Sequence, residues 1–125
     1  MTDFSAAELR ARTEAAQGLM AEAGLDALLL TTEPEFRYFS GFRTLFWQSP
    51  TRSWFLVLRA SGEPVAIIPS IGAALMEKTW IGDIRTWSSP DPGDDGIGLL
   101  AGALEGARRI GLPMGAESSL RMPLL

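Results

Sequence analysis

The sequence contains no histidine and no cysteine among its 125 residues. Histidine is the commonest metal ligand and the usual general base near neutral pH. Cysteine supplies disulfides, thiolate zinc ligands and thiol nucleophiles. Without either residue, the chain cannot build a self-contained hydrolytic triad, a histidine-bearing metal site or a thiol active site. We therefore expect no catalytic residue and no metal ligand of these kinds in this chain.

Basic charge and long apolar runs are also scarce. The chain has 11 basic and 15 acidic residues, a net charge of -4, and Lys78 is its only lysine. Its arginines are scattered and form no basic stripe of the kind that binds nucleic acid. No run approaches the ~20 apolar residues of a membrane span, and the N-terminus lacks the pattern of a signal peptide. We expect a cytoplasmic protein with neither a nucleic-acid nor a membrane partner.

Apolar residues, by contrast, are plentiful enough for one core. At 46% hydrophobic, the chain is expected to form a single domain over residues 1–125. Ser5 and Glu8 have the spacing of a capping box, which begins a helix. Gly24 fits the left-handed position at a helix end. Because an apolar stripe recurs every three or four residues between them, we predict a helix over Ala6–Ala23.

Shorter apolar runs alternate with turn signals along the rest of the chain. They predict strands at 27–32, 54–58, 65–69, 81–87 and 110–114, the second and third forming an antiparallel hairpin. Helical segments are predicted at 35–39, at 71–78 with Ser70 as its cap, and at 97–108. Continuous apolar strands are typical of sheets covered on both faces. The fold class is therefore α/β, with a mixed sheet of about five to six strands flanked by helices.

Two further motifs around the last helix are interpreted as structural. Gly98, Gly102 and Gly106 recur every four residues, which predicts a glycine face packed tightly on the sheet. Asp91, Asp94 and Asp95 lack the ligand spacing of a calcium loop,. We interpret these aspartates as a solvated cap at the helix start, where negative charge is favourable.

A loop rich in aromatic residues and arginine is the strongest candidate site. Phe46, Trp47, Gln48 and Arg52 lie in a segment that mixes aromatic and polar groups. This composition is typical of ligand-facing or partner-facing loops. The alternative is that the aromatic residues of this region simply fill an edge of the core.

Several short motifs resemble the N-terminal domain of the creatinase/prolidase family, the Xaa-Pro peptidase group of M24-type metallopeptidases. They are Gly-Leu-Asp-Ala-Leu-Leu-Leu at 24–30, Tyr-Phe-Ser-Gly-Phe at 38–42, Ile-Ile-Pro at 67–69 and Arg-Ile-Gly-Leu at 109–112. The resemblance implies a mixed sheet with a ribonuclease H-like motif, and it marks Tyr38, Gly41 and Phe42 as fold markers. In this family the metal site lies in a C-terminal "pita-bread" domain, which is absent from this chain.

The resemblance also implies a function for the protein that carries this domain. It would be an aminopeptidase P/prolidase-like homodimer acting on a proline-containing peptide or another small substrate. Two divalent ions, manganese, cobalt or zinc, would activate a water. The loop of Phe46, Trp47, Gln48 and Arg52 would close the partner subunit's active site, with Arg52 suited to a substrate carboxylate. A creatinase-like enzyme, a sulfonium-compound lyase and a free-standing binding module are the alternatives.

Overall fold

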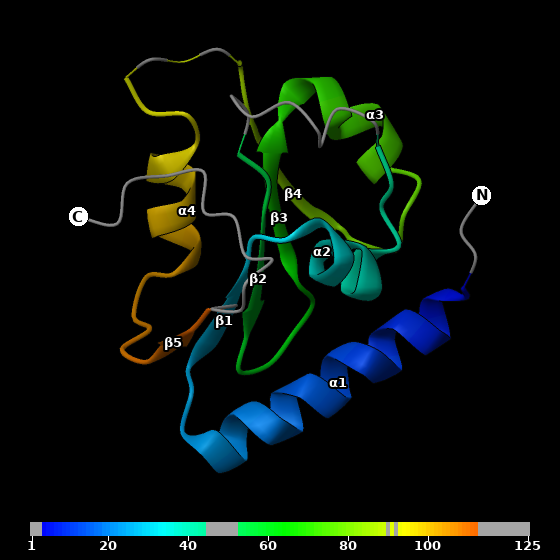
Figure 1. Ribbon diagram of the computed structural model, residues 1–125, viewed down its shortest axis with the longest axis vertical. Coiled ribbons are helices and arrows are strands. Elements are labelled where there is room, and N and C mark those ends of the chain that lie inside the picture. The colour runs from blue at the N-terminus through cyan, green and yellow to red at the C-terminus, as the bar shows by residue number, and fades with distance from the viewer. Residues whose placement is uncertain (1–3, 45–52, 90, 92, 113–125) are drawn as a thin grey trace.

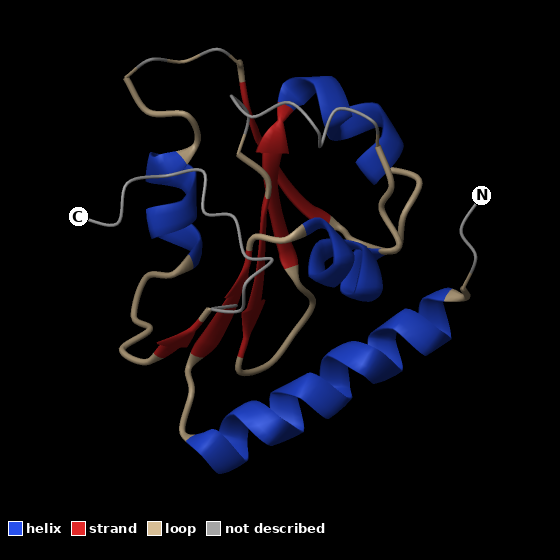
Figure 2. Ribbon diagram, viewed as in Figure 1, coloured by secondary structure: helices blue, strands red, loops and turns tan. Residues whose placement is uncertain are grey.

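The computed structural model describes residues 4–44, 53–89, 91 and 93–112. A five-stranded sheet runs through the centre, with helices on both of its faces (Figures 1 and 2). The strands are β1 (Ala27–Leu30), β2 (Phe55–Arg59), β3 (Val65–Pro69), β4 (Asp83–Trp87) and β5 (Ile110–Gly111). The helices are α1 (Ala6–Ala23), α2 (Glu33–Ser40), α3 (Ala73–Met76) and α4 (Ile97–Ala103), with a 3-10 turn, η2 (Ser70–Gly72), before α3.

The strand order β4-β3-β2-β1-β5 gives a mixed sheet. β2 pairs antiparallel with both β1 and β3. The two outer pairs, β1 with β5 and β3 with β4, are parallel. The predicted mixed α/β fold and its antiparallel hairpin are therefore confirmed.

The sheet separates two apolar clusters, because alternate side chains of a strand point to opposite faces. Leu56 and Leu58 of β2 lie in the cluster that is covered by α1, α2 and α3. Phe55 and Val57 lie in the cluster on the opposite face, together with residues of α4. Burial on both faces explains why the central strands are continuously apolar, as the sequence indicates.

The bounds of α1 agree with the prediction because both helix ends carry a local signal. Ser5 Oγ accepts a hydrogen bond of 3.1 Å from the backbone N–H of Glu8. Gly24 ends the helix with φ of 72°, a conformation that glycine adopts without steric strain,. Leu9, Thr13 and Met20 form its buried stripe against the sheet.

The second helix is longer than predicted, and the preceding strand is shorter. α2 begins at Glu33, with Pro34 in its first turn. A proline is accepted there because the first-turn N–H groups have no partner within the helix. Thr32 becomes the N-cap residue, so the predicted strand 27–32 ends at Leu30.

The helices after the hairpin are shorter than the sequence indicates. Ser70 is the first residue of η2 and makes no capping hydrogen bond, so its predicted role as cap is wrong. α4 ends at Ala103, and Gly106 adopts φ of 85° beyond it. The predicted glycine face is also wrong, because Gly98 and Gly102 are exposed and α4 buries Leu100 and Ala103 instead.

The aspartate loop before α4 is held by hydrogen bonds to the backbone. Asp94 Oδ1 accepts a 2.7 Å bond from the N–H of Gly98, in the first turn of the helix. Asp91 Oδ1 accepts from the N–H of Gly93, and Asp95 Oδ1 from the N–H of Asp91. These contacts confirm that the carboxylates cap the loop and the helix.

Asp26 fastens the segment before β5 to the start of β1. Its Oδ2 accepts hydrogen bonds from the backbone N–H groups of Arg108 and Arg109, at 2.8 and 2.9 Å. The bond from Arg109, followed by that from Arg108, holds the pKa of the Asp26 carboxyl below its usual value,. Since a carboxylate accepts such bonds better than a carboxylic acid does, this contact depends on pH.

Candidate functional site

The structure describes the two ends of the predicted aromatic loop. Phe46, Trp47, Gln48 and Arg52 themselves lie outside the described residues. The described ends are residues 41–44, which follow α2, and residues 53–54, which precede β2. These two ends hold the loop on the domain. We call the cluster formed by Phe36, Phe42 and Trp54 the loop base.

Aromatic side chains join the two loop ends. The rings of Phe42 and Trp54 have centroids 5.7 Å apart, and Phe42 also packs against Phe36 at 5.8 Å. Phe42 is 3% exposed and Trp54 2% exposed, so both belong to the core below the loop. For these two residues, the interpretation as core-filling aromatics is correct. Their packing fixes the points at which the loop leaves and re-enters the domain.

The backbone turns sharply between α2 and the loop. Gly41 ends α2 with φ of 76°, and its N–H donates to the carbonyl of Arg37. The Ser40 hydroxyl donates to the carbonyl of Phe36 at 2.7 Å and accepts from the N–H of Phe42 at 3.0 Å. A side chain at position 41 would be strained in this conformation. This geometry gives a physical reason for the predicted importance of Gly41 and Phe42.

A glycine in η2 leaves room for the loop base. A Cβ atom added to Gly72 would lie 2.7 Å from Cζ3 of the Trp54 ring. Since no larger residue fits without moving the indole, Gly72 sets how deeply Trp54 is inserted. No pattern in the sequence marks this contact, because it joins residues that are not neighbours in the chain.

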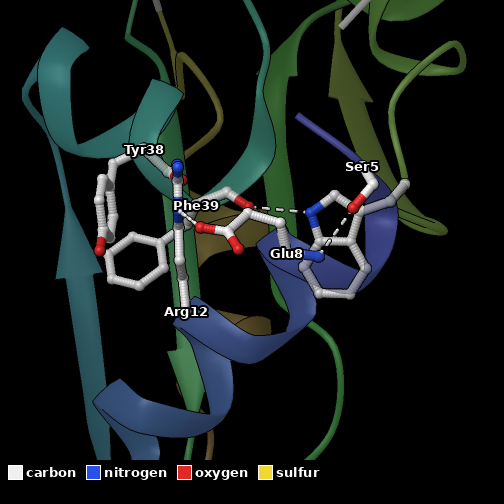
Figure 3. Close-up of polar contacts among 6 residues, drawn as sticks. Ser5, Glu8, Arg12, Tyr38 and Phe39 are labelled. Carbon is white, nitrogen blue, oxygen red and sulfur yellow. Dashed lines mark hydrogen bonds and ion pairs between the residues drawn. The ribbon is translucent and has the colours of Figure 1, made fainter. Parts of the chain in front are cut away.

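Tyr38, the remaining predicted fold marker, lies at the surface and links α2 to α1. Its side chain is half exposed, and its ring packs edge-on against Phe39. The guanidinium of Arg12 lies 4.3 Å from the ring centroid and donates a 2.8 Å hydrogen bond to the Tyr38 carbonyl (Figure 3). Glu8 pairs with the same arginine at 3.4 Å. Arg12 was not singled out from the sequence, where only its spacing of four from Glu8 marks it.

The described part of the chain offers no metal centre of its own. Within residues 4–44, 53–89, 91 and 93–112, no group of three or more acidic residues could hold an ion. The three aspartates before α4, Asp91, Asp94 and Asp95, accept backbone N–H groups instead. Over the same ranges, no helix has the length and apolar character needed to cross a membrane.

Taken together, these elements define an α/β domain that carries a loop on an aromatic base. Residues 12–121 match the family model of the Creatinase/Prolidase N-terminal domain. Because that match covers most of the chain, the protein belongs to this family. The resemblance seen in the motifs at 24–30, 38–42, 67–69 and 109–112 is thereby confirmed.

Solved structures with the same fold include whole enzymes and isolated domains. Dipeptidase PepE from Mycobacterium ulcerans is 30% identical, with a TM-score of 0.70 over 90% of this chain and 31% of its own. The N-terminal domain of Xaa-Pro dipeptidase from Lactobacillus brevis is 14% identical, with a TM-score of 0.71 over 84% of this chain and 78% of its own. The prolidase from Pyrococcus horikoshii is 17% identical, with a TM-score of 0.62 over 82% of this chain and 26% of its own. The last two show the fold alone.

The chain spans about a third of the length of the PepE chain that it matches. A comparison with curated protein sequences gave no significant match.

Proposed function

We propose that this chain is the non-catalytic N-terminal domain of a metal-dependent Xaa-Pro dipeptidase. The observation that carries the proposal is its 30% identity to a dipeptidase over 90% of this chain, within 31% of that enzyme's length. In this proposal, catalysis belongs to a further domain of the whole protein. The N-terminal domain supports a homodimer and closes the active site of the partner subunit.

The loop base supports a closing role for residues 45–52. Phe42 and Trp54 hold the two ends of the loop 5.7 Å apart between ring centroids. Fixed ends lower the entropic cost of placing a segment against a substrate. Arg52 would then bind the substrate carboxylate through two parallel hydrogen bonds, while Phe46 and Trp47 exclude water.

The metal ions of such an enzyme would be bound outside the described part of this chain. The three aspartates before α4, Asp91, Asp94 and Asp95, accept hydrogen bonds from backbone N–H groups. They therefore do not fit a two-metal site, and no step of catalysis is assigned to them. Manganese, cobalt or zinc ions held by the further domain would activate the attacking water.

The test uses the full-length protein, assayed on Xaa-Pro dipeptides with and without manganese. We expect Arg52→Ala to raise KM about tenfold or more, because a charge-assisted carboxylate contact is lost. Arg37→Ala is the matched control, since Arg37 is an exposed arginine of α2. An unchanged KM for Arg52→Ala would contradict the proposed loop. A metal-loaded protein that hydrolyses no Xaa-Pro peptide would contradict the dipeptidase and favour a creatinase-like or lyase reaction.

Mixed dimers test whether the loop acts in the partner subunit. One subunit carries Arg52→Ala and the other is inactivated in the proposed catalytic domain. In the mixed dimer, the inactivated subunit contributes an intact loop to the active site of the Arg52→Ala subunit. We expect a KM close to that of the unmodified enzyme. A KM that stays as high as in the pure Arg52→Ala dimer would mean that the loop serves its own subunit.

A further inference from the structure

A second concave site lies at the opposite end of β2 from the loop base. It is a cavity of about 390 Å³ between α1, the turn joining β2 to β3, and Trp80. β2 separates the two sites, because Trp54 precedes the strand and residues 60–63 follow it. The β2–β3 turn lies beside α1 (Figure 1). The volume is within the range of small-molecule sites, roughly 300–1,000 Å³.

The frame of this cavity is fixed by hydrogen bonds between distant segments. Gln17 Nε2 donates to the carbonyls of Arg59 and Gly62, at 2.9 and 3.0 Å, and so ties the turn to α1. The indole N–H of Trp80 donates to the carbonyl of Phe39 at 2.8 Å. The cavity wall therefore has an ordered shape before any ligand enters.

Several polar groups that line the cavity have no partner among the described residues. Thr13 is 2% exposed, and its buried hydroxyl makes no hydrogen bond within those ranges. Arg10 stacks over the ring of Trp80, 5.5 Å from its centroid, and forms no ion pair there. The Glu14 carboxylate likewise forms none within the described part of the chain. Arg10 and Glu14 are exposed, so their charged groups are accessible to a ligand in the cavity.

The charges of the cavity are of both signs and come from facing elements. Arg10 and Glu14 belong to α1, and Glu63 belongs to the β2–β3 turn. A guanidinium stacked on an aromatic ring keeps its N–H edge available for a carboxylate. Glu14 and Glu63 can accept hydrogen bonds from an ammonium group, although Glu63 Oε1 also accepts the N–H of Gly82 at 3.2 Å. A single ligand that pairs with both signs carries a cationic group and an anionic group, as an ammonium and a carboxylate do in a zwitterion.

We propose that this cavity binds a small zwitterion, either a free amino acid or a short peptide. Arg10 holds its carboxylate against Trp80, and Glu14 and Glu63 hold its ammonium. This inference goes beyond the proposed dipeptidase function and does not depend on it. If both hold, the cavity is an accessory site for the substrates or products of the same enzyme.

The test is a titration of the 15N-labelled chain followed by NMR. L-leucine and glycyl-L-leucine are added up to about 20 mM, a range that detects dissociation constants of about 1–10 mM. We expect shifts centred on the Trp80 indole N–H and the backbone N–H of Gly62. Shifts with leucine alone would identify a free amino acid as the ligand, and shifts with the dipeptide alone would identify a peptide. No shift at these signals with either compound would overturn the proposal.

Capped ligands and charge variants decide whether the recognition is that of a zwitterion. N-acetyl-L-leucine lacks the ammonium, and L-leucinamide lacks the carboxylate. We expect both to bind at least about tenfold more weakly, as do Arg10→Gln and Glu14→Gln with the zwitterion. Arg37→Gln on α2 is the control and should bind normally. Equal shifts from the capped compounds, or normal binding by both charge variants, would overturn the proposal even if the cavity is occupied. A dispersed spectrum establishes that each variant is folded.

Discussion

The two faces of the sheet are held by different kinds of interaction. On one face, three helices pack on the strands, and the aromatic loop base fills the end of that layer. On the other face, the seven-residue helix α4 buries Leu100 and Ala103. Arg59 of β2 reinforces this face, because its guanidinium donates to the carbonyls of Ala103 and Glu105, at 2.7 and 2.9 Å. The α4 face therefore combines apolar packing with hydrogen bonds from a strand side chain to the end of the helix.

Glycine has a different function on each face. On the helix-rich face, Gly72 leaves space for the Trp54 ring but has an ordinary φ of -93°. On the α4 face, Gly96 begins the helix with φ of 84°, and a Cβ there would lie 2.6 Å from Nε1 of Trp87. Position 96 therefore requires glycine for two reasons, conformation and space. The attachment of α4 depends on backbone geometry as much as on apolar contact.

The largest expected effect comes from removing the tryptophan of the helix-rich face. Trp54→Ala should lower the free energy of unfolding by about 3–5 kcal/mol, because a buried indole is replaced by a cavity. Urea denaturation measures the loss, and Leu19→Ala on the exposed side of α1 serves as the control. Leu19 is 66% exposed, so its truncation should change stability by less than about 0.5 kcal/mol. A loss below about 1 kcal/mol for Trp54→Ala would mean that the loop base contributes little to this face.

The second prediction concerns the start of α4. Gly96→Ala combines a strained φ, worth about 1–2 kcal/mol, with overpacking against Trp87, worth about 1–3 kcal/mol. We expect a loss of about 2–4 kcal/mol in the free energy of unfolding, measured by urea denaturation. Gly102→Ala in the same helix is the matched control, because an added Cβ there meets only Arg85 Nη1 at 4.0 Å. It should be neutral or stabilise the protein by up to about 1 kcal/mol. Equal effects of the two substitutions would contradict the special geometry of position 96.

The fold was predictable wherever local chemistry decides the structure. α1 and β3 have the predicted bounds, because caps end the former, and Pro64 precedes and Pro69 ends the latter. The alternation of buried strands and helices was enough to predict a mixed sheet. The errors lie where several local signals compete. The predicted strand 27–32 is too long, because Thr32 is the N-cap residue of α2 and Pro34 fits the first turn of that helix. The glycine spacing in α4 was interpreted as a packed face although the buried side chains are Leu100 and Ala103.

The candidate site could be predicted only in part, because its geometry depends on distant contacts. The composition of the loop identified Phe46, Trp47, Gln48 and Arg52, and their roles remain predictions. The loop base depends on Phe42 meeting Trp54, and the zwitterion cavity on Gln17 meeting Gly62. Neither pair is close in sequence, and no periodic pattern connects them. Residues such as these become visible only when the sheet topology is known.

The smallest expected effect concerns Asp26, which attaches the segment after α4 through hydrogen bonds. It tests whether the α4 face depends on such bonds at a second place. Asp26 accepts the N–H groups of Arg108 and Arg109 in the segment that follows α4. Its pKa is lowered in the folded protein, chiefly by the bond from Arg109. Because the folded-state pKa is lowered, the ionised carboxylate stabilises the folded protein. This contribution to the free energy of unfolding is complete above the unfolded-state pKa. It is lost as the pH falls through the folded-state pKa. Because Asp26 is exposed, solvent weakens the contact and the effect on stability is small.

Asp26→Asn should therefore flatten the dependence of Tm on pH in the acid range, between about pH 2 and pH 6. The unmodified chain should lose more Tm on acidification than the variant, and the two curves should approach each other at the acid end. Arg108→Ala is the control, since it removes a nearby charge but keeps the backbone N–H that Asp26 accepts. Because the two backbone bonds are the main cause of the lowered pKa, Arg108→Ala should keep most of the dependence. If it flattened the curve as much as Asp26→Asn, side-chain charge and not the backbone contact would hold this segment in place.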